Sequence, residues 1–298
     1  MGTPAIMYRH YERQFGANVA HLAQQKTSKL RSTVTEQSGS FNSHVFKIMG
    51  VAGAMTAKTA PAGTNSNKRT ATPYADQVYN NRVATSLPYG IADSLEWDDV
   101  VRMANDPASA LTTSFAAAVG RRIDDTIIAA ATGAALDDEA TSNSHPAGSQ
   151  VGGASTAFSF DLVRETRELA LSKDIDPDEM LTFVVSPDAI SKLLDEETAT
   201  SFDYVNAKAL MSGGVVNGWM GFNWIVSNRL TDASPTSSQR YALAYTKRAI
   251  GLFFAKQPFA RIAEDPGVSF ATTVYAGVDV GAVRVIDTEC FRVHYLES

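Results

Sequence analysis

The fold is decided by the stretch Asp106–Gly133, which reads DPASALTTSFAAAVGRRIDDTIIAAATG. Asp106 is suited to be a helix N-cap, Pro107 fits the first helical position, and Gly133 suits a left-handed residue that closes the other end. Between these ends, apolar residues recur at steps of three and four, which is the spacing of one helix face. That face comprises Leu111, Phe115, Ala118, Val119, Arg122, Ile123, Ile127 and Ala130. The stretch therefore predicts one helix of roughly 40 Å, from a rise of about 1.5 Å per residue.

The opposite face of this helix carries Arg121, Asp124 and Asp125, so we expect it to meet water or other subunits. Its alanines and Gly120 allow neighbouring backbones to approach closely. Nothing in the stretch is typical of a catalytic helix. We therefore expect a spine against which sheets and partner subunits pack.

Composition permits a large, soluble, multi-part protein. The chain has 298 residues, which is longer than a typical domain, and 44% of them are apolar. The charged fraction of 19% is low, which favours a surface partly covered by other subunits. The single cysteine, Cys290, excludes an internal disulfide framework and is expected to be buried. No uncharged run approaches the ~20 apolar residues of a membrane span, and no signal peptide opens the sequence.

Charge is divided unevenly along the chain. Residues Met1–Ala92 contain ten Lys and Arg against three Asp and Glu, a balance of +7. Residues Asp93–Ser298 contain sixteen against twenty-nine, a balance of −13. A basic first third can bind an external polyanion or the acidic body of an identical neighbour, although such an imbalance can also arise by chance.

The basic first third has little core pattern of its own. His21–Val34 has three basic residues and no acid, which predicts an arm that another surface must order. In Gly39–Ala92, two short strands are expected, from Phe41 to Met49 and from Gln77 to Leu87. The excursion Gly50–Pro73 between them carries Lys58, Lys68 and Arg69. Since a two-stranded excursion is marginal alone, we expect it to lie across a neighbouring copy.

The acidic part of the chain, Asp93–Ser298, has the alternation of helix and strand patterns that is typical of an α/β protein. A short helix is expected over Asp93–Ala104, and a loop over Leu136–Thr156. The C-terminal part is expected to be β-rich and to cover the apolar face of the long helix, with the α/β segment inserted between the two. Further helices are predicted at Phe160–Lys173, Asp188–Leu194 and Val205–Met211, and strands at Met180–Val185, Trp219–Ser227, Arg240–Thr246, Gly251–Ala255, Val268–Tyr275, Ala282–Ile286 and Phe291–Leu296.

Motifs for catalysis or ligand binding are missing from the sequence. Asp174, Asp176 and Asp178 alternate like the first ligands of a calcium loop. The pattern then fails, because Pro177 interrupts the fourth position, Glu179 stands where the loop needs glycine, and Val185 replaces the closing glutamate. There is no Gly-x-Ser-x-Gly motif, no glycine-rich phosphate loop and no histidine spacing typical of a metal site. We therefore predict no catalytic, cofactor-binding or metal residues, and a protein that is not an enzyme.

Four segments in order resemble the major capsid proteins of tailed double-stranded DNA bacteriophages, which have the Hong Kong 97-type capsid fold. They are HLAQQKTSKLRSTV at His21–Val34, the long helix Asp106–Gly133, FVVSPDAISKLL at Phe183–Leu194 and MGFNWIVSNRL at Met220–Leu230. Each motif is degenerate by itself, and the ordered set carries the resemblance over most of the chain.

The resemblance implies an α+β fold with four parts. These are an N-terminal arm at 1–38, an extended β-hairpin at 39–92, a peripheral domain at 93–156 and 260–298, and an axial domain at 157–259. It also implies a homo-oligomer of pentamers and hexamers that closes into an icosahedral shell around packaged DNA, in the virion, after assembly in the host bacterial cytoplasm. A separate scaffolding protein, a portal and a cement protein are the implied partners. We expect inter-subunit contacts at Lys26, Lys29, Arg31, Lys58, Lys68, Arg69, Arg82, Arg121, Asp124 and Asp125.

Three other functions remain open at this point. An encapsulin-like cargo compartment shares the fold, and neighbouring genes for a terminase and a portal would distinguish a phage. An uncharacterised enzyme would need a bound metal or a pH-dependent turnover. A nucleic-acid-binding protein would use the basic first third, where aromatic residues are few.

Overall fold

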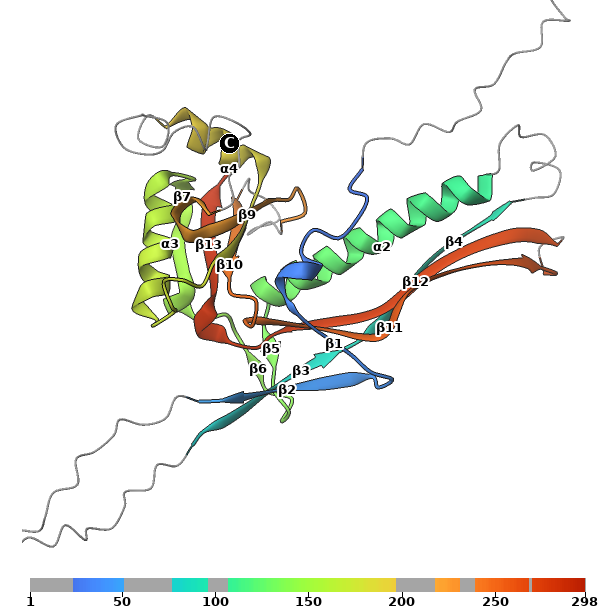
Figure 1. Ribbon diagram of the computed structural model, residues 1–298, viewed down its shortest axis with the longest axis horizontal. Coiled ribbons are helices and arrows are strands. Elements are labelled where there is room, and N and C mark those ends of the chain that lie inside the picture. The colour runs from blue at the N-terminus through green and yellow to red at the C-terminus, as the bar shows by residue number, and fades with distance from the viewer. Residues whose placement is uncertain are drawn as a thin grey trace, which may run out of the picture.

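The structure is a computed structural model, and it describes residues 24–50, 77–95, 107–196, 218–230, 239–267 and 270–297. Two sheets are joined beside one long helix, and a two-stranded hairpin projects away from them (Figure 1). The fold is thus mixed helix and strand, as predicted.

The long helix α2 spans Pro107–Thr132, which confirms the predicted element almost to the residue. Phe115, Ile123 and Ile127 are buried as expected, whereas Arg122 is exposed and lies over the ring of Tyr89. The prediction of a left-handed Gly133 is wrong, because its φ is not positive. A glycine is needed there for another reason: a Cβ would lie 2.7 Å from the carbonyl oxygen of Ala129, which accepts a hydrogen bond from the Gly133 N–H.

The helix packs on a four-stranded sheet with the order β1-β11-β12-β4. The strands span Thr35–Ser38 (β1), Ile250–Asp265 (β11), Ala271–Arg284 (β12) and Leu87–Leu95 (β4). The strands β11 and β12 form one long antiparallel pair where the sequence predicted shorter strands. Turn-forming residues such as Gly277 and Gly281 lie inside this pair instead of ending it, and Gly281 allows the backbone of Thr85 to approach.

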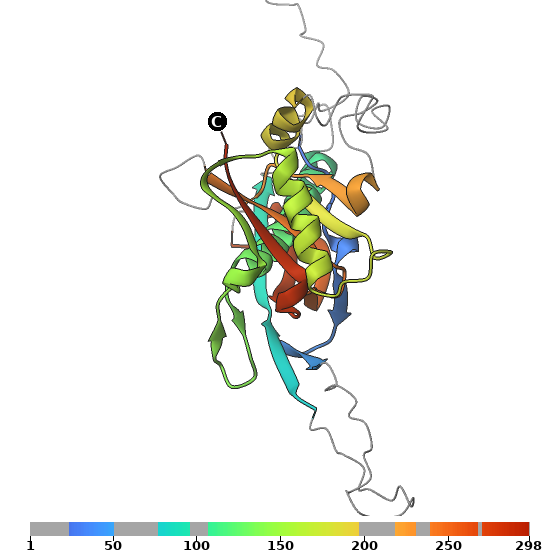
Figure 2. The same cartoon turned by 90° about the vertical axis from the view of Figure 1, so that its left-hand side faces the viewer.

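The second sheet has five strands in the order β7-β13-β10-β8-β9. Helix α3 (Phe160–Ser172) covers one of its faces (Figure 2), and helix α4 (Pro187–Asp195) packs at its edge. Ser186 caps α4, since its hydroxyl oxygen accepts the N–H of Ala189. The strands span Gln150–Ala157 (β7), Leu181–Val185 (β8), Phe222–Val226 (β9), Gln239–Tyr245 (β10) and Cys290–Leu296 (β13).

Three predicted placements need correction. The last strand, β13, was expected against the long helix, but it pairs with β10 and β7 in the five-stranded sheet. The range 150–156 was predicted as loop, because its Gly, Ser and Ala are poor strand formers, yet it belongs to β7 beside β13. Residues 250–259 were placed with the inserted segment but belong to β11 in the four-stranded sheet. The chain therefore changes sheet at Thr246–Ala249 and again at Val285–Glu289.

The two sheets share a core. Val184, Leu243 and Tyr245 from the five-stranded sheet pack in one cluster with Ile127 of α2 and Leu252 of β11. A second cluster fills the space between the five-stranded sheet and its helices, around Phe183, Phe222 and Trp224. The relative position of the two halves is therefore fixed by buried apolar side chains.

The projecting hairpin consists of β2 (Ser43–Met49) and β3 (Tyr79–Thr85), close to the two predicted strands. The second predicted strand ends at Ser86, after which the chain turns into β4. Residues 93–95, predicted to begin a helix, extend β4 instead, and the rest of that helix lies outside the described residues. The predicted helix at Val205–Met211 and the excursion Gly50–Pro73, apart from Gly50, also lie outside them.

Small elements complete the described chain. The β5–β6 turn pairs Ala135–Leu136 with Ser142–Asn143 and lies beside the hairpin (Figure 2). Single turns of 3₁₀ helix span Arg31–Thr33, Ala147–Ser149, Trp219–Gly221 and Asp287–Glu289.

Candidate functional site

The segment Gln24–Ser38 is attached to its own subunit. Leu30 and Val34 are buried in the cluster shared by both sheets, and β1 pairs in parallel with β11. This corrects the prediction that His21–Val34 is an arm that another surface must order, for the described residues from Gln24 onward. Residues 1–23 lie outside the described part of the chain.

One carboxylate holds this segment on α2. Asp124 is fully buried and accepts hydrogen bonds from the backbone N–H groups of Lys29 (3.0 Å) and Leu30 (3.1 Å) and from the Ser28 hydroxyl (2.5 Å). The Gln25 amide also donates to it. Consecutive backbone N–H groups of this kind form an anion-binding nest. The expectation that Asp124 faces water or another subunit is therefore wrong.

Neighbouring groups strengthen the attachment. The guanidinium of Arg121 donates to the Gln24 side-chain oxygen at 2.9 Å, and the Lys29 ammonium donates to the Val226 carbonyl oxygen at 2.8 Å. Gly120 makes room for the segment, since a Cβ there would lie 2.9 Å from the Ser28 nitrogen. Together these contacts fix the point at which the N-terminal segment meets α2.

The remaining predicted contact residues have partners of several kinds. Arg31 pairs with Glu36 at 2.6 Å, which raises the pKa of Arg31 and lowers that of Glu36 through their hydrogen bond. Asp125 forms an ion pair with Arg229 at 2.5 Å. Lys26 is exposed, and Lys58, Lys68 and Arg69 lie outside the described residues. A role between subunits stays a prediction for these residues.

Arg82 ties the hairpin to the body. It donates from β3 to the Asp287 carboxylate at 2.8 Å, and the other oxygen of Asp287 accepts from Arg284 at 2.6 Å. Arg284 is fully buried and also donates to the carbonyl oxygens of Gly133, Asn143 and Ser144. The cation thereby satisfies the C-terminal end of α2, where positive charge is favoured. Sequence reasoning missed Arg284 because an arginine in a strand usually faces solvent.

The hairpin divides into a packed base and an exposed outer part. At its base, Phe46 packs closely on Gly251, where a Cβ would lie 2.5 Å from the ring. Where the described strands end, Met49 is exposed opposite Tyr79, and Val78, one position before Tyr79, is also exposed. Several large apolar side chains are therefore left without a partner in the described part of their own chain.

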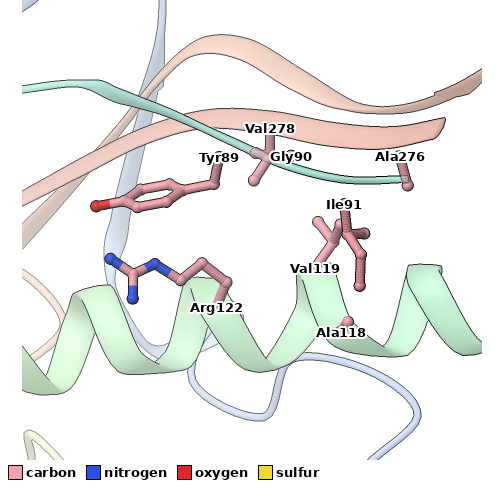
Figure 3. A pocket seen from close by; sticks show the side chains of 8 residues that line it. All are labelled: Tyr89, Gly90, Ile91, Ala118, Val119, Arg122, Ala276 and Val278. Carbon is pink, nitrogen blue, oxygen red and sulfur yellow. The ribbon is translucent and has the colours of Figure 1, made fainter. Parts of the chain in front are cut away.

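A slot of about 230 Å³ opens between α2 and the edge strand β4 (Figure 3). Ile91, Ala118 and Val119 line its apolar end. At the other end the Arg122 guanidinium lies 3.8 Å from the centre of the Tyr89 ring, a cation–π contact.

Groups typical of catalysis are not assembled in the described residues. There, no three His, Cys, Asp or Glu side chains are grouped as a metal ion requires. Burial raises the pKa of Cys290 to about 12, which keeps the thiol protonated and unreactive. No helix among the described residues is long and apolar enough to cross a membrane.

The arrangement of long helix, long-stranded sheet, second α/β sheet and projecting hairpin matches the fold of solved phage capsid structures. The sequence matches the family model described as phage capsid protein over residues 7–297, so the chain belongs to this family.

Solved structures show the same fold at low sequence identity. The capsid of Ralstonia phage GP4 is 10% identical, with a TM-score of 0.68, and the match covers 97% of this chain and 96% of that one. The capsid of cyanophage P-SCSP1u is 15% identical, with a TM-score of 0.69 and coverage of 100% and 96%. The mature capsid of bacteriophage PhiM1 is 16% identical, with a TM-score of 0.69 and coverage of 96% and 92%. No curated protein sequence matches this chain significantly.

Proposed function

We propose that this phage capsid protein is the major shell protein of a tailed phage, and that identical copies assemble into an icosahedral shell around packaged double-stranded DNA. The observation that carries the proposal is the hairpin β2–β3, whose base is packed into the subunit and whose outer end carries exposed Met49 and Tyr79. Such a surface needs a partner, and in a closed shell each subunit has several identical neighbours.

The function is structural. In the shell, the region 39–92 would extend over an adjacent subunit, and the five-stranded sheet with its helices would meet its copies around the five-fold and six-fold axes. Each subunit of such an obligate assembly is expected to bury well over ~2,000 Å². Individual contacts can be weak, because several act together.

Partners and location follow from the same proposal. A scaffolding protein, a portal and a cement protein are expected partners, and assembly is expected in the cytoplasm of the host bacterium before the shell becomes part of the virion. The basic residues Lys26, Lys58, Lys68 and Arg69 remain candidates for contacts with acidic surfaces of neighbouring subunits.

Electron microscopy of the full chain, expressed alone and together with the scaffolding protein of its own genome, tests the proposal. We expect closed particles built from rings of five and six subunits. Only monomers or irregular aggregates under both conditions would contradict a shell function. Nuclease-protected DNA in particles made with the portal and terminase would separate a phage shell from a cargo compartment.

A further inference from the structure

The slot beside α2 has a charge, on Arg122, for which the described residues supply no ion-pair partner. In the described residues, the Arg122 guanidinium makes no ion pair or hydrogen bond, and its cation–π contact with Tyr89 leaves it exposed at the mouth of the slot. Ile91, at the apolar end, is 40% exposed. The slot thus presents an apolar cavity next to a free cation, which suits an apolar side chain followed closely by a carboxylate.

That combination is present on β11, which pairs with β1 only over Gly251–Phe254 and beyond that point forms the opposite edge of the same sheet in the described structure. On β11, Ile262 is 57% exposed, and Glu264 is exposed without an ion pair or hydrogen bond among the described residues. The two point to the same face, since they pair with Val274 and Thr272, two positions apart on β12. This face is also the one that carries Ile91, which lies opposite Ala276.

The spacing of the two surfaces agrees. Two residues along a strand are about 6.6–6.8 Å apart. Along a helix, the three to four residues from Ala118 or Val119 to Arg122 span about 4.5–6 Å. An extended segment can therefore place Ile262 in the apolar end while Glu264 reaches the guanidinium.

Basic segments of the chain are poorer occupants. Residues 39–75 contain no acid and carry Lys47, Lys58, Lys68 and Arg69, and His21–Val34 contains only basic charges. Either would bring positive charge to Arg122. Charge complementarity thus favours the β11 edge over the arm and the hairpin.

We propose that the slot at Arg122 of one subunit receives the β11 edge of a second copy, with Ile262 in the apolar end and Glu264 paired with Arg122. The inference rests on the proposed self-assembly and names one of its contacts. Because β4 and the part of β11 beyond its pairing with β1 lie at opposite edges of one sheet, the contact is head-to-tail and can repeat around a ring. Both edges carry a proline, Pro88 and Pro258, which discourages backbone pairing between strands and favours a contact through side chains.

Charge exchange tests the pairing in the full chain. Arg122→Glu and Glu264→Arg should each raise the protein concentration needed for particle formation by about tenfold or more, because each brings like charges together. The double variant should restore assembly towards the wild-type concentration. Glu139→Arg makes the same change in the exposed β5–β6 turn and should assemble as the wild type does. Light scattering and electron microscopy give the readout, and thermal unfolding of the unassembled subunits checks that each variant folds.

A disulfide gives an independent test. Within one chain, Ile91 and Ile262 lie on strands separated by β12, so their Cα atoms are at least about 9.4 Å apart and cannot be bridged. In Ile91→Cys/Ile262→Cys, mild oxidation during assembly should therefore yield covalent oligomers up to complete rings, whereas either single variant should not.

Two results would overturn the inference: single charge variants that assemble like the wild type, or a double variant no better than the single ones. Cysteine pairs that stay monomeric in assembled particles would also overturn it. In each of these three cases wild-type particles still form, so the shell function stands. Failure of the wild type to form particles would instead remove the proposed function.

Discussion

The carboxylate of Asp124 is an example of a single residue whose role depends on what covers it. It has no exposed surface and accepts hydrogen bonds from two consecutive backbone amides, at Lys29 and Leu30. From the sequence, Asp124 is indistinguishable from its neighbour Asp125, which forms a partly exposed ion pair with Arg229. The two adjacent aspartates are therefore expected to contribute differently to the free energy of unfolding.

Asp124→Asn should lower the free energy of unfolding by about 2–3 kcal/mol, because an amide cannot replace a carboxylate that accepts from several donors. It should also increase protease cleavage near Gln24–Leu30. Asp125→Asn is the matched control and should cost no more than about 1 kcal/mol, as exposed ion pairs do. Chemical denaturation and limited proteolysis of the unassembled subunit provide the measurements. Equal losses in both variants would contradict the anchoring role of Asp124.

The single residue His145 makes the free energy of unfolding depend on pH. Burial, and then the charges of Arg284 and Arg292, lower the pKa of His145 to about 4. The unfolded chain binds a proton at this histidine near pH 6.5, whereas the folded chain does not until about pH 4. Stability should therefore fall as the pH is lowered between these values and level off below them.

His145→Gln should reduce this fall, because glutamine does not titrate. Urea unfolding of wild type and variant at several pH values between 7 and 4 measures the difference in slope. An unchanged slope in the variant would assign the loss of stability to other groups.

At the scale of elements, α2 is defined by its sequence and placed by its contacts. Its length follows from the apolar periodicity between Pro107 and Gly133, which no proline interrupts. Its position follows from partners far along the chain: Arg284 and Arg292 donate to the carbonyl oxygens of Gly133 and Thr132 at its C-terminal end. Those arginines lie on different sheets, so the helix end joins the two halves.

The variant Gly120→Ala distinguishes the contribution of helix propensity to stability from that of the packing of residue 120 against Ser28. Alanine should stabilise the helix by about 1 kcal/mol in isolation. In the subunit, its methyl group would lie 2.9 Å from the Ser28 nitrogen and push the segment away from Asp124, whose hydrogen bonds are each worth about 1.5–3 kcal/mol. We therefore expect a net loss of stability and faster cleavage near Ser28. A gain in the free energy of unfolding would show that the segment shifts without losing these bonds.

Local sequence patterns located several elements well and missed others. The predicted α3, β8 and α4 agree with the structure within a few residues, because each has a clear apolar periodicity and α4 begins with Ser186 and Pro187. The strand β7 was missed, since Gly152 and Gly153 weaken its strand pattern and pairing with β13 compensates. The continuity of β11 and β12 was missed because cross-strand pairing overrides turn-forming residues.

At the scale of the whole molecule, the segment between β2 and β3 is expected to serve the assembly and not the subunit. Deleting Thr56–Ala71 should leave a subunit that unfolds at nearly the wild-type temperature, because this stretch contains no Val, Leu, Ile, Met or aromatic residue with which to build a core. The same variant should fail to close stable shells. Thermal unfolding and electron microscopy measure the two effects, and loss of subunit folding would show that the segment belongs to a core.

The sequence by itself determined the helix α2, the α+β class, the uneven charge along the chain and the family resemblance, because these depend on local periodicity and on residue types in order. Only the tertiary structure decided which strands share a sheet and that Asp124 and Arg284 are buried. It also decided that the slot and the exposed part of β11 lie at opposite edges of one sheet. These features depend on contacts between residues up to two hundred positions apart, and no local pattern specifies such partners.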